Sequence, residues 1–414
     1  MSSPELLTST RYQLRGILEE IKEILGGEFP YQHPRDALSE LKERFLDCKD
    51  QLDRVAASSD DTLIETTCFT VAEEIRWSIG LVGFLLRSTN VRNAFEAWGP
   101  LLRLARRLLG VDTKLVVSSE WEFSPFTFVG LSAIPDFVLI GFPAPESSNP
   151  FLLAIAGHEL GHNLWAKRCL QQKFQPLVRD LIIKAINQHW DEFCNYTNLR
   201  VNQTELETDI FALREWTPSL DWALRQCQEL FCDCVGVRIF GGSYVCAFEY
   251  LLGPRDRAAR SFIYPSNFDR ARTIITATKS YNMQQISITF GDSFKLPLPS
   301  NRAAREAFLL KIADDARLSL TNDLIREADA VVTEAGVLKP NEELTKKCLK
   351  RFKCLSPVEG MSEISELLNA AWICIKSENF YSDEQHEDRK LHLISELVWK
   401  SIEVFEIEQR LNTL

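Results

Sequence analysis

Apolar residues recur every three or four positions through the first 110 residues, which is the spacing of amphipathic helices. One apolar stripe runs through residues 14–25 and stops at Gly26-Gly27, and a second follows residues 38–55 in steps of three and four. Each apolar stripe must pack against another helix to be shielded from water. The pattern therefore predicts a small helical bundle over residues 1–110.

Residues 112–142 follow a different pattern, rich in β-branched and aromatic side chains and interrupted by Pro125 and Pro135. Such segments are typical of short strands. We expect two to four strands, drawn from residues 114–118, 126–131 and 137–142, in a small and mostly antiparallel sheet.

Helical patterns resume near residue 151 and continue to the end of the chain, where an apolar stripe over residues 394–405 marks the last helix. The segment 291–300 contains Pro297 and Pro299 and reads as a boundary. The fold class we expect is mainly α with a minor β part (α+β). Its three regions would be a helical bundle at 1–110, a core at 111–290 and a helical region at 291–414.

The amino-acid composition limits the classes of binding partner and the cellular compartment that we expect. The chain has 414 residues, 47 basic and 58 acidic side chains and a net charge of −11, which argues against nucleic acid or an anionic membrane as partner. No apolar run is long enough to cross a bilayer, and the first residues lack a secretory signal. Eleven scattered cysteines do not suggest a disulfide framework, so we expect a cytoplasmic protein.

One segment carries recognisable chemistry, His158-Glu159-Leu160-Gly161-His162. Two histidines four apart project from one face of a helix and can reach the same metal ion, and neutral imidazole suits zinc. Glu159 lies about 100° round the helix from His158. It can therefore flank the metal and accept a proton from a metal-bound water molecule.

A zinc site that performs catalysis needs a third protein ligand. Glu229 and Asp233 lie four apart in a strongly apolar stretch, where Glu229 could bind the metal and Asp233 could accept a hydrogen bond from a ligating imidazole. Glu205 and Asp209 have the same spacing in a more polar stretch that looks like a helix start. His189 is a further alternative, more typical of a surface or helix-packing residue.

Cys227, Cys232 and Cys234 surround the same apolar stretch. Positions 232 and 234 point about 200° apart on a helix, so the three thiols cannot share one ion. We interpret them as buried free thiols.

The two motifs together, His158-Glu159-x-x-His162 and Glu229-x-x-x-Asp233, resemble those of the gluzincin group of zinc metallopeptidases. The resemblance covers residues 112–285. It implies a zincin-like core, a zinc ion held by His158, His162 and Glu229, Glu159 as general base and Asp233 as partner of a ligand histidine. It also implies that the strand over residues 137–142 could pair with an extended substrate by strand addition.

Members of this group usually place a His or Tyr near the oxyanion that forms during hydrolysis. Tyr264-Pro-x-x-x-x-Arg270 is similar to a His-Pro-x-x-x-x-Arg segment of some cytosolic gluzincin-like proteins, with Tyr264 in place of the histidine. Tyr264 is thus a candidate donor, with Tyr244 and Tyr250 as alternatives. Arg270 and Arg272 would brace the site, and Ser266 would cap the next helix, with Asp269 at the third position.

The leading hypothesis is a zinc-dependent peptidase that acts on a peptide or protein. One alternative is a binding or scaffold protein that keeps this fold without turnover. Another is an effector protease whose helical flanks cover the cleft until a regulatory partner binds.

Overall fold

The chain is mainly helical and, in the part described, contains one small sheet. The computed structural model describes residues 2–88, 94–122, 125–198, 201–253, 261–283, 289–296, 302–361, 363–377 and 387–411. Unit 1 comprises Met1–Arg106 and Val111–Ser148, and unit 2 comprises Arg107–Gly110 and Asn149–Leu414. This division groups the strands with the N-terminal helices and keeps residues 291–414 with the helices that precede them, while the three expected regions stay a prediction. Residues 297–300 of the second expected boundary lie outside the described residues.

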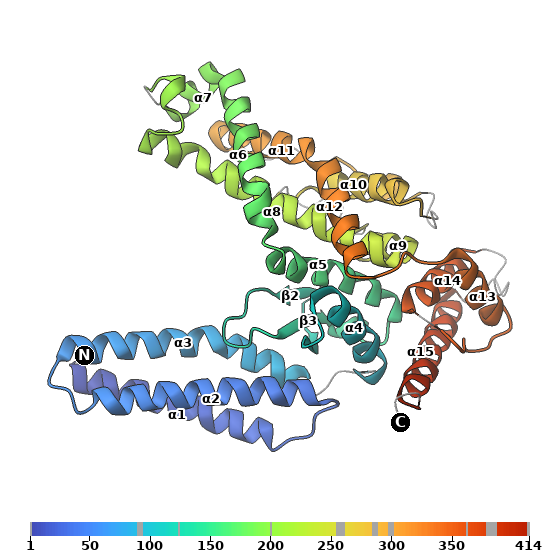
Figure 1. Cartoon of the computed structure of the whole chain (residues 1–414), viewed down its shortest axis with the longest axis horizontal. Coiled ribbons are helices and arrows are strands. Elements are labelled where there is room, and N and C mark those ends of the chain that lie inside the picture. The colour runs from blue at the N-terminus through green and yellow to red at the C-terminus, as the bar shows by residue number, and fades with distance from the viewer. Residues whose placement is uncertain are drawn as a thin grey trace. The chain divides into compact units, whose positions relative to one another are not determined.

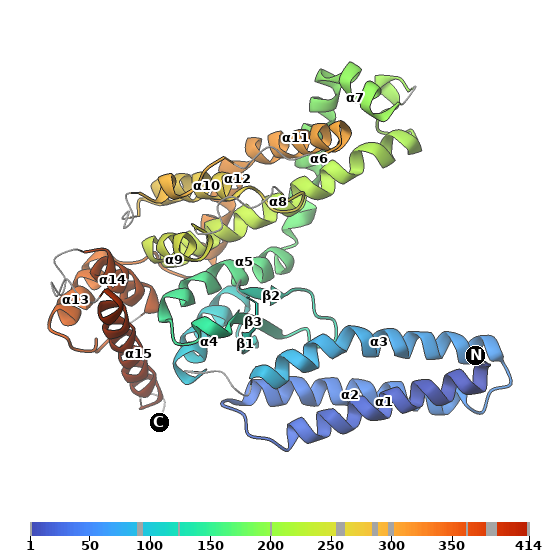
Figure 2. The ribbon, with the colours of Figure 1, turned by 180° about the vertical axis from the view of Figure 1, so that it is seen from behind.

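The N-terminal helices of unit 1 form the expected bundle. Helices α1 (Ser3–Leu25), α2 (Gln32–Val55) and α3 (Asp61–Arg87) lie side by side (Figures 1 and 2). Helix α4 (Ala94–Leu109) follows. The apolar stripes seen in the sequence meet inside the bundle, where Ile21, Leu38, Leu41 and Leu52 are fully buried. Helical periodicity was therefore sufficient to predict this part of the fold.

The sheet of unit 1 is mixed, not mostly antiparallel. Strands β1 (Lys114–Glu120), β2 (Phe126–Phe128) and β3 (Phe137–Pro143) are arranged in the order β1-β3-β2. β1 and β3 pair in parallel over their full length, whereas β2 and β3 pair antiparallel over three residues. Nearly every residue of β1 and β3 is buried, which is typical of parallel strands covered on both faces. The expected antiparallel arrangement was wrong because it overlooked these continuous apolar runs.

The central position of β3 also corrects the expectation of strand addition. One side of β3 is paired with β1, and on the other side Leu139, Ile140 and Gly141 are paired with β2. A strand adds to a sheet only at a free edge. The strand over residues 137–142 therefore has no free edge along its centre for a substrate peptide.

Unit 2 is built round one long helix, α8 (Ile210–Phe240), which contacts α5, α6, α9, α10, α11, α12 and α14 (Figure 1). The other helices of this unit are α5 (Ala156–Lys167), α6 (Leu170–Gln188), α7 (Trp190–Thr197), α9 (Gly242–Leu252), α10 (Asn267–Ser280), α11 (Ala304–Ser319), α12 (Thr321–Glu334), α13 (Glu342–Lys353), α14 (Ile364–Lys376) and α15 (Glu387–Leu411). Short 3-10 turns link some of the elements: η2 (Ala144–Glu146) in unit 1, and η3 (Pro150–Ile155), η4 (Gln203–Glu205) and η6 (Phe290–Ser293) in unit 2. The stripe at 394–405 is buried in α15, as expected.

Helices α5 and α8 approach each other closely at glycines. A Cβ atom on Gly161 would lie 2.8 Å from Cα of Cys232, and one on Gly157 would lie 2.9 Å from Cα of Gly236. Real side chains do not tolerate such distances to a backbone. The spacing of Gly157 and Gly161 puts both glycines on one face of α5, which lets the two backbones touch.

Two chain-wide expectations can be compared with the structure. All eleven cysteines are free thiols, as their irregular spacing predicted. Within the described ranges, no helix has both the length and the apolar composition needed to cross a bilayer.

We expect Gly161→Ala to destabilise the protein by about 1–3 kcal/mol, because the added methyl group forces α5 away from α8. Gly80→Ala is the matched control at an exposed position of α3, where a Cβ meets nothing within 4 Å. This control should gain about 0.5–1 kcal/mol. Urea unfolding followed by circular dichroism measures both changes. A Gly161→Ala protein as stable as the unaltered chain would contradict the close packing.

Candidate metal centre

The two predicted motifs lie on the two helices that meet at the glycines. Helix α5 follows η3, whose first turn is capped by the Asn149 side chain accepting from the backbone N–H of Phe151. Asp209 caps α8 by accepting from the N–H groups of Phe211 and Ala212. Because both helices have defined starts and a close crossing, His158 and His162 on α5 are held against Glu229 and Asp233 on α8.

The three predicted ligands converge. The Nε2 atoms of His158 and His162 are 3.2 Å apart, and the Glu229 carboxylate oxygens lie 3.4 Å from the first and 3.7 Å from the second. Zinc holds nitrogen and oxygen ligands at about 2.0 Å, so two ligand atoms of a tetrahedral site are about 3.3 Å apart. The three observed distances are close to this value, with a different Glu229 oxygen facing each imidazole, so the three side chains lie near enough to one another to hold one small cation.

Asp233 connects the candidate ligand His158 to other helices of unit 2. Its fully buried carboxylate accepts from Nδ1 of His158 at 2.9 Å, from the Tyr244 hydroxyl at 2.7 Å and from two nitrogens of Arg270 at 2.7 and 2.8 Å. The hydrogen bond to Nδ1 leaves Nε2 of His158 facing Glu229 and His162. Asp233 thus accepts a hydrogen bond from His158 and is held by Arg270, while their roles beside a bound metal stay predictions.

Burial and neighbouring charges shift the pKa values of the two imidazoles in opposite directions. Burial lowers the pKa of His158, but its hydrogen bonds with Asp233 and Glu229 outweigh burial and raise that pKa to about 10. Burial and the charge of His158 lower the pKa of His162 to about 4. Only one of the two imidazoles is therefore charged at neutral pH without a bound cation.

Glu159 lies beside the ligands and has the proton affinity of a base that works near neutrality. Its side chain is 4% exposed. Burial raises the pKa of Glu159 to about 7, although the charge of His158 opposes this shift. A carboxylate poised in this range can both accept and return a proton.

Tyr264 lies on the segment before α10, and 49% of it is exposed. Burial raises the pKa of its phenol, and the charges of Glu229 and Glu159 act in the same direction. The side chain is therefore within electrostatic reach of the metal centre while remaining open to solvent. Ser266 caps α10 by accepting from the N–H of Asp269, as predicted. Arg272, in contrast, is exposed and lies over the Phe268 ring.

Sequence reasoning missed two neighbours of the site. The Tyr244 hydroxyl, weighed only as a donor to an oxyanion, instead donates to Asp233. Gly236 makes room for the Tyr244 ring, which a Cβ there would overlap. The Cys232 thiol, interpreted as an inert buried group, forms with His158 and His162 a group whose potential ligand atoms lie within 4.8 Å of one another. Such a group can hold a metal ion, and the Glu229 oxygens at 3.4 and 3.7 Å from the same imidazoles make Glu229 the other candidate for the third ligand.

The rival ligands lie elsewhere. Glu205 is exposed in η4, where its carboxylate accepts from the N–H of Asn202, and Asp209 caps α8. Both belong to a helix start, as the polar sequence suggested. His189 is exposed, with Nδ1 4.0 Å from the Glu192 carboxylate.

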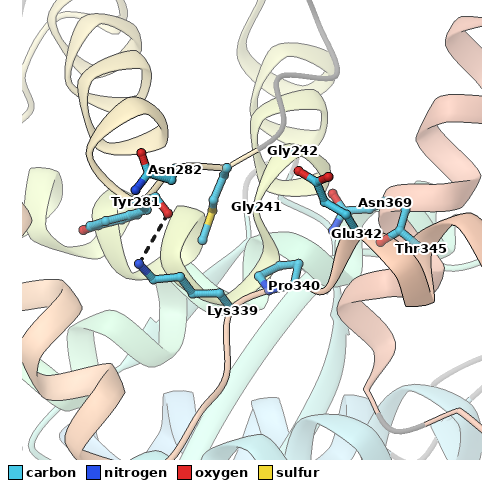
Figure 3. Close-up of a pocket in the computed structure, with 10 residues that line it drawn as sticks. Gly241, Gly242, Tyr281, Asn282, Lys339, Pro340, Glu342, Thr345 and Asn369 are labelled. Carbon is cyan, nitrogen blue, oxygen red and sulfur yellow. Dashed lines mark hydrogen bonds between the residues drawn. The ribbon is translucent and has the colours of Figure 1, made fainter.

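A separate pocket lies beyond the C-terminal end of α8 (Figure 3). Its lining includes Gly241, Tyr281, Lys339 and Asn369 but no residue of the metal centre. Lys339 donates to the backbone carbonyl of Tyr281 at 3.3 Å, and the Asn369 amide is engaged by the backbone at Ser243 and Phe240. The Lys339 ammonium and the Asn369 amide therefore already bind backbone groups.

Comparisons with protein-family models, with curated proteins and with solved structures found no match to this chain. The functional argument therefore rests on the residues of the site and their geometry.

We expect Asp233→Asn to lower the affinity for zinc by about 10–100-fold, because it removes the anionic acceptor that orients His158. It should also lower the melting temperature, since it leaves the buried Arg270 guanidinium without its counter-ion. Asp209→Asn is the matched control on the same helix, because asparagine caps a helix as well as aspartate does. Competition with a zinc chelator measures the affinity. Equal zinc affinity in both variants would contradict the role of Asp233.

Proposed function

We propose that this protein is a zinc-dependent peptidase of the gluzincin type. The observation that carries the proposal is the convergence of His158, His162 and Glu229 at 3.2–3.7 Å, with a buried glutamate beside them. Two imidazoles and one carboxylate form a ligand set of catalytic zinc sites and leave one tetrahedral position open. A site that only stabilised the fold would not require a buried Glu159 next to that position.

Each side chain has a distinct task in this proposal. His158, His162 and Glu229 would hold zinc, which polarises the scissile carbonyl and makes water a stronger acid. Glu159 accepts the proton of the attacking water and passes it to the leaving amine. Tyr264 donates a hydrogen bond to the oxyanion that develops on the scissile carbonyl. Asp233, held by Arg270 and Tyr244, keeps His158 in the required tautomer.

We also propose that the site belongs to a zincin-like catalytic core and that the enzyme acts on a peptide or protein in the cytoplasm. Eleven free thiols fit a reducing compartment.

We expect Glu159→Gln to abolish peptide hydrolysis while zinc remains bound, because glutamine cannot accept the proton but does not disturb the ligands. Glu229→Ala should lose zinc as well. Glu205→Gln is the control at the rival carboxylate and should keep both zinc and activity. Elemental analysis and a fluorogenic peptide assay give the two measurements. Turnover by the Glu159→Gln protein would disprove the assignment of the base.

A catalytically silent, closed metal site is the second candidate, and the nearness of Cys232 to both histidines favours it. If its thiolate completed the coordination, no position would remain for water. Burial raises the pKa of Cys232 well above its usual value, which disfavours the thiolate before a cation binds. The open site remains the better supported of the two.

Cys232→Ser separates the two candidates. For an open site we expect zinc affinity within about threefold of the unaltered protein, because serine preserves the size of the side chain and the three ligands are intact. For a closed site the affinity should fall by orders of magnitude, and the unaltered protein should not hydrolyse peptides.

A further inference from the structure

The face of α8 that carries Glu229 continues toward the start of the helix. Arg225 precedes Glu229 by about one helical turn and Trp222 by about two, and the three side chains point within about 60° of one another. Their Cα atoms lie about 6 and 10 Å from that of Glu229 along the helix axis. This face therefore leads from the metal centre out to solvent, where Arg225 is exposed.

The segment before α10 is fastened along this face. The Phe262 ring stacks on Trp222 with ring centroids 4.4 Å apart, and the Phe262 carbonyl accepts from the Gln226 amide at 3.0 Å. Arg302 also contacts this ring, with Cζ of its guanidinium 3.9 Å from the Phe262 ring centroid. Phe262 is thus held on α8, and Tyr264, two residues later, is placed at the rim of the site.

Arg225 differs from the other arginines near the site. Arg270 is paired with Asp233, Arg238 with Asp329 and Arg317 with Asp269. Arg225 makes no ion pair or hydrogen bond to any residue that the structure describes. Its guanidinium is an exposed cation beside a reactive centre in a chain with a net charge of −11.

We propose that Arg225 forms a substrate subsite for a carboxylate side chain, so that the peptidase selects peptides with Asp or Glu near the cleaved bond. This inference rests on the proposed function. A guanidinium binds a carboxylate with two parallel hydrogen bonds, which favours Asp and Glu over their amides. Successive residues of an extended peptide are about 3.3 Å apart. Arg225 would therefore meet a side chain two or three residues from the cleaved bond, either before it or after it but not on both sides. The Trp222–Phe262 stack forms the apolar wall of this subsite.

The test uses the full chain loaded with zinc and a peptide mixture of broad composition, with cleavage sites identified by mass spectrometry. We expect Asp and Glu to be enriched at one position within three residues of the cleaved bond. Arg225→Glu should replace this preference by one for Lys and Arg at the same position. Arg214→Glu is the matched control, because Arg214 is also exposed on α8 but lies about 16 Å earlier along the helix. It should keep the original profile.

Binding provides a readout that does not require turnover. A peptide from the cleavage profile and its Asn or Gln counterpart are titrated against the Glu159→Gln protein. The acidic peptide should bind about fivefold more tightly, and Arg225→Gln in the same background should remove the difference.

The outcomes distinguish a failure of the peptidase assignment from a failure of the Arg225 subsite. Absence of cleavage by the zinc-loaded protein would overturn the peptidase assignment and the subsite with it. Cleavage without an acidic preference, or with one that Arg225→Glu leaves unchanged, would overturn the subsite alone.

Discussion

The contact between α5 and α8 is the constraint on which the candidate site depends. Gly157 and Gly161 on one helix meet Gly236 and Cys232 on the other at distances that leave no room for a Cβ atom. This close approach lets the imidazoles of α5 and the Glu229 carboxylate of α8 lie 3.4 and 3.7 Å apart.

Once the helices are in contact, the buried charges must be satisfied. Asp233 does this by accepting hydrogen bonds from α5, α9 and α10 at once, through His158, Tyr244 and Arg270. A buried carboxylate without such partners would be strongly destabilising. The same network orients His158, so the groups that stabilise the centre of unit 2 also determine the geometry of the ligands.

The candidate metal centre has the fully buried Asp233 on one side, whereas Tyr264 and Arg225 beside it are exposed. This asymmetry fits a hydrolytic centre, which needs a buried base and fixed ligands on one side and access for an extended chain on the other. On the exposed side Arg225 makes no ion pair with any residue that the structure describes, and under our proposal it would meet an acidic side chain of the substrate.

The sequence alone determined the helical bundle and the strand segments, and it predicted the residues of the candidate metal centre, because these depend on local spacing. Histidines four apart share a helix face wherever the helix lies, and the carboxylates Glu229 and Asp233 stood out because they interrupt an apolar stretch. The direction of strand pairing, the central place of β3 and the division into two units were not readable, because each depends on contacts between distant segments. The same holds for Tyr244, Cys232 and the Trp222–Phe262 stack. Tertiary structure decided these features, since only the close crossing of α5 and α8 and the packing of the segment before α10 determine which side chains meet.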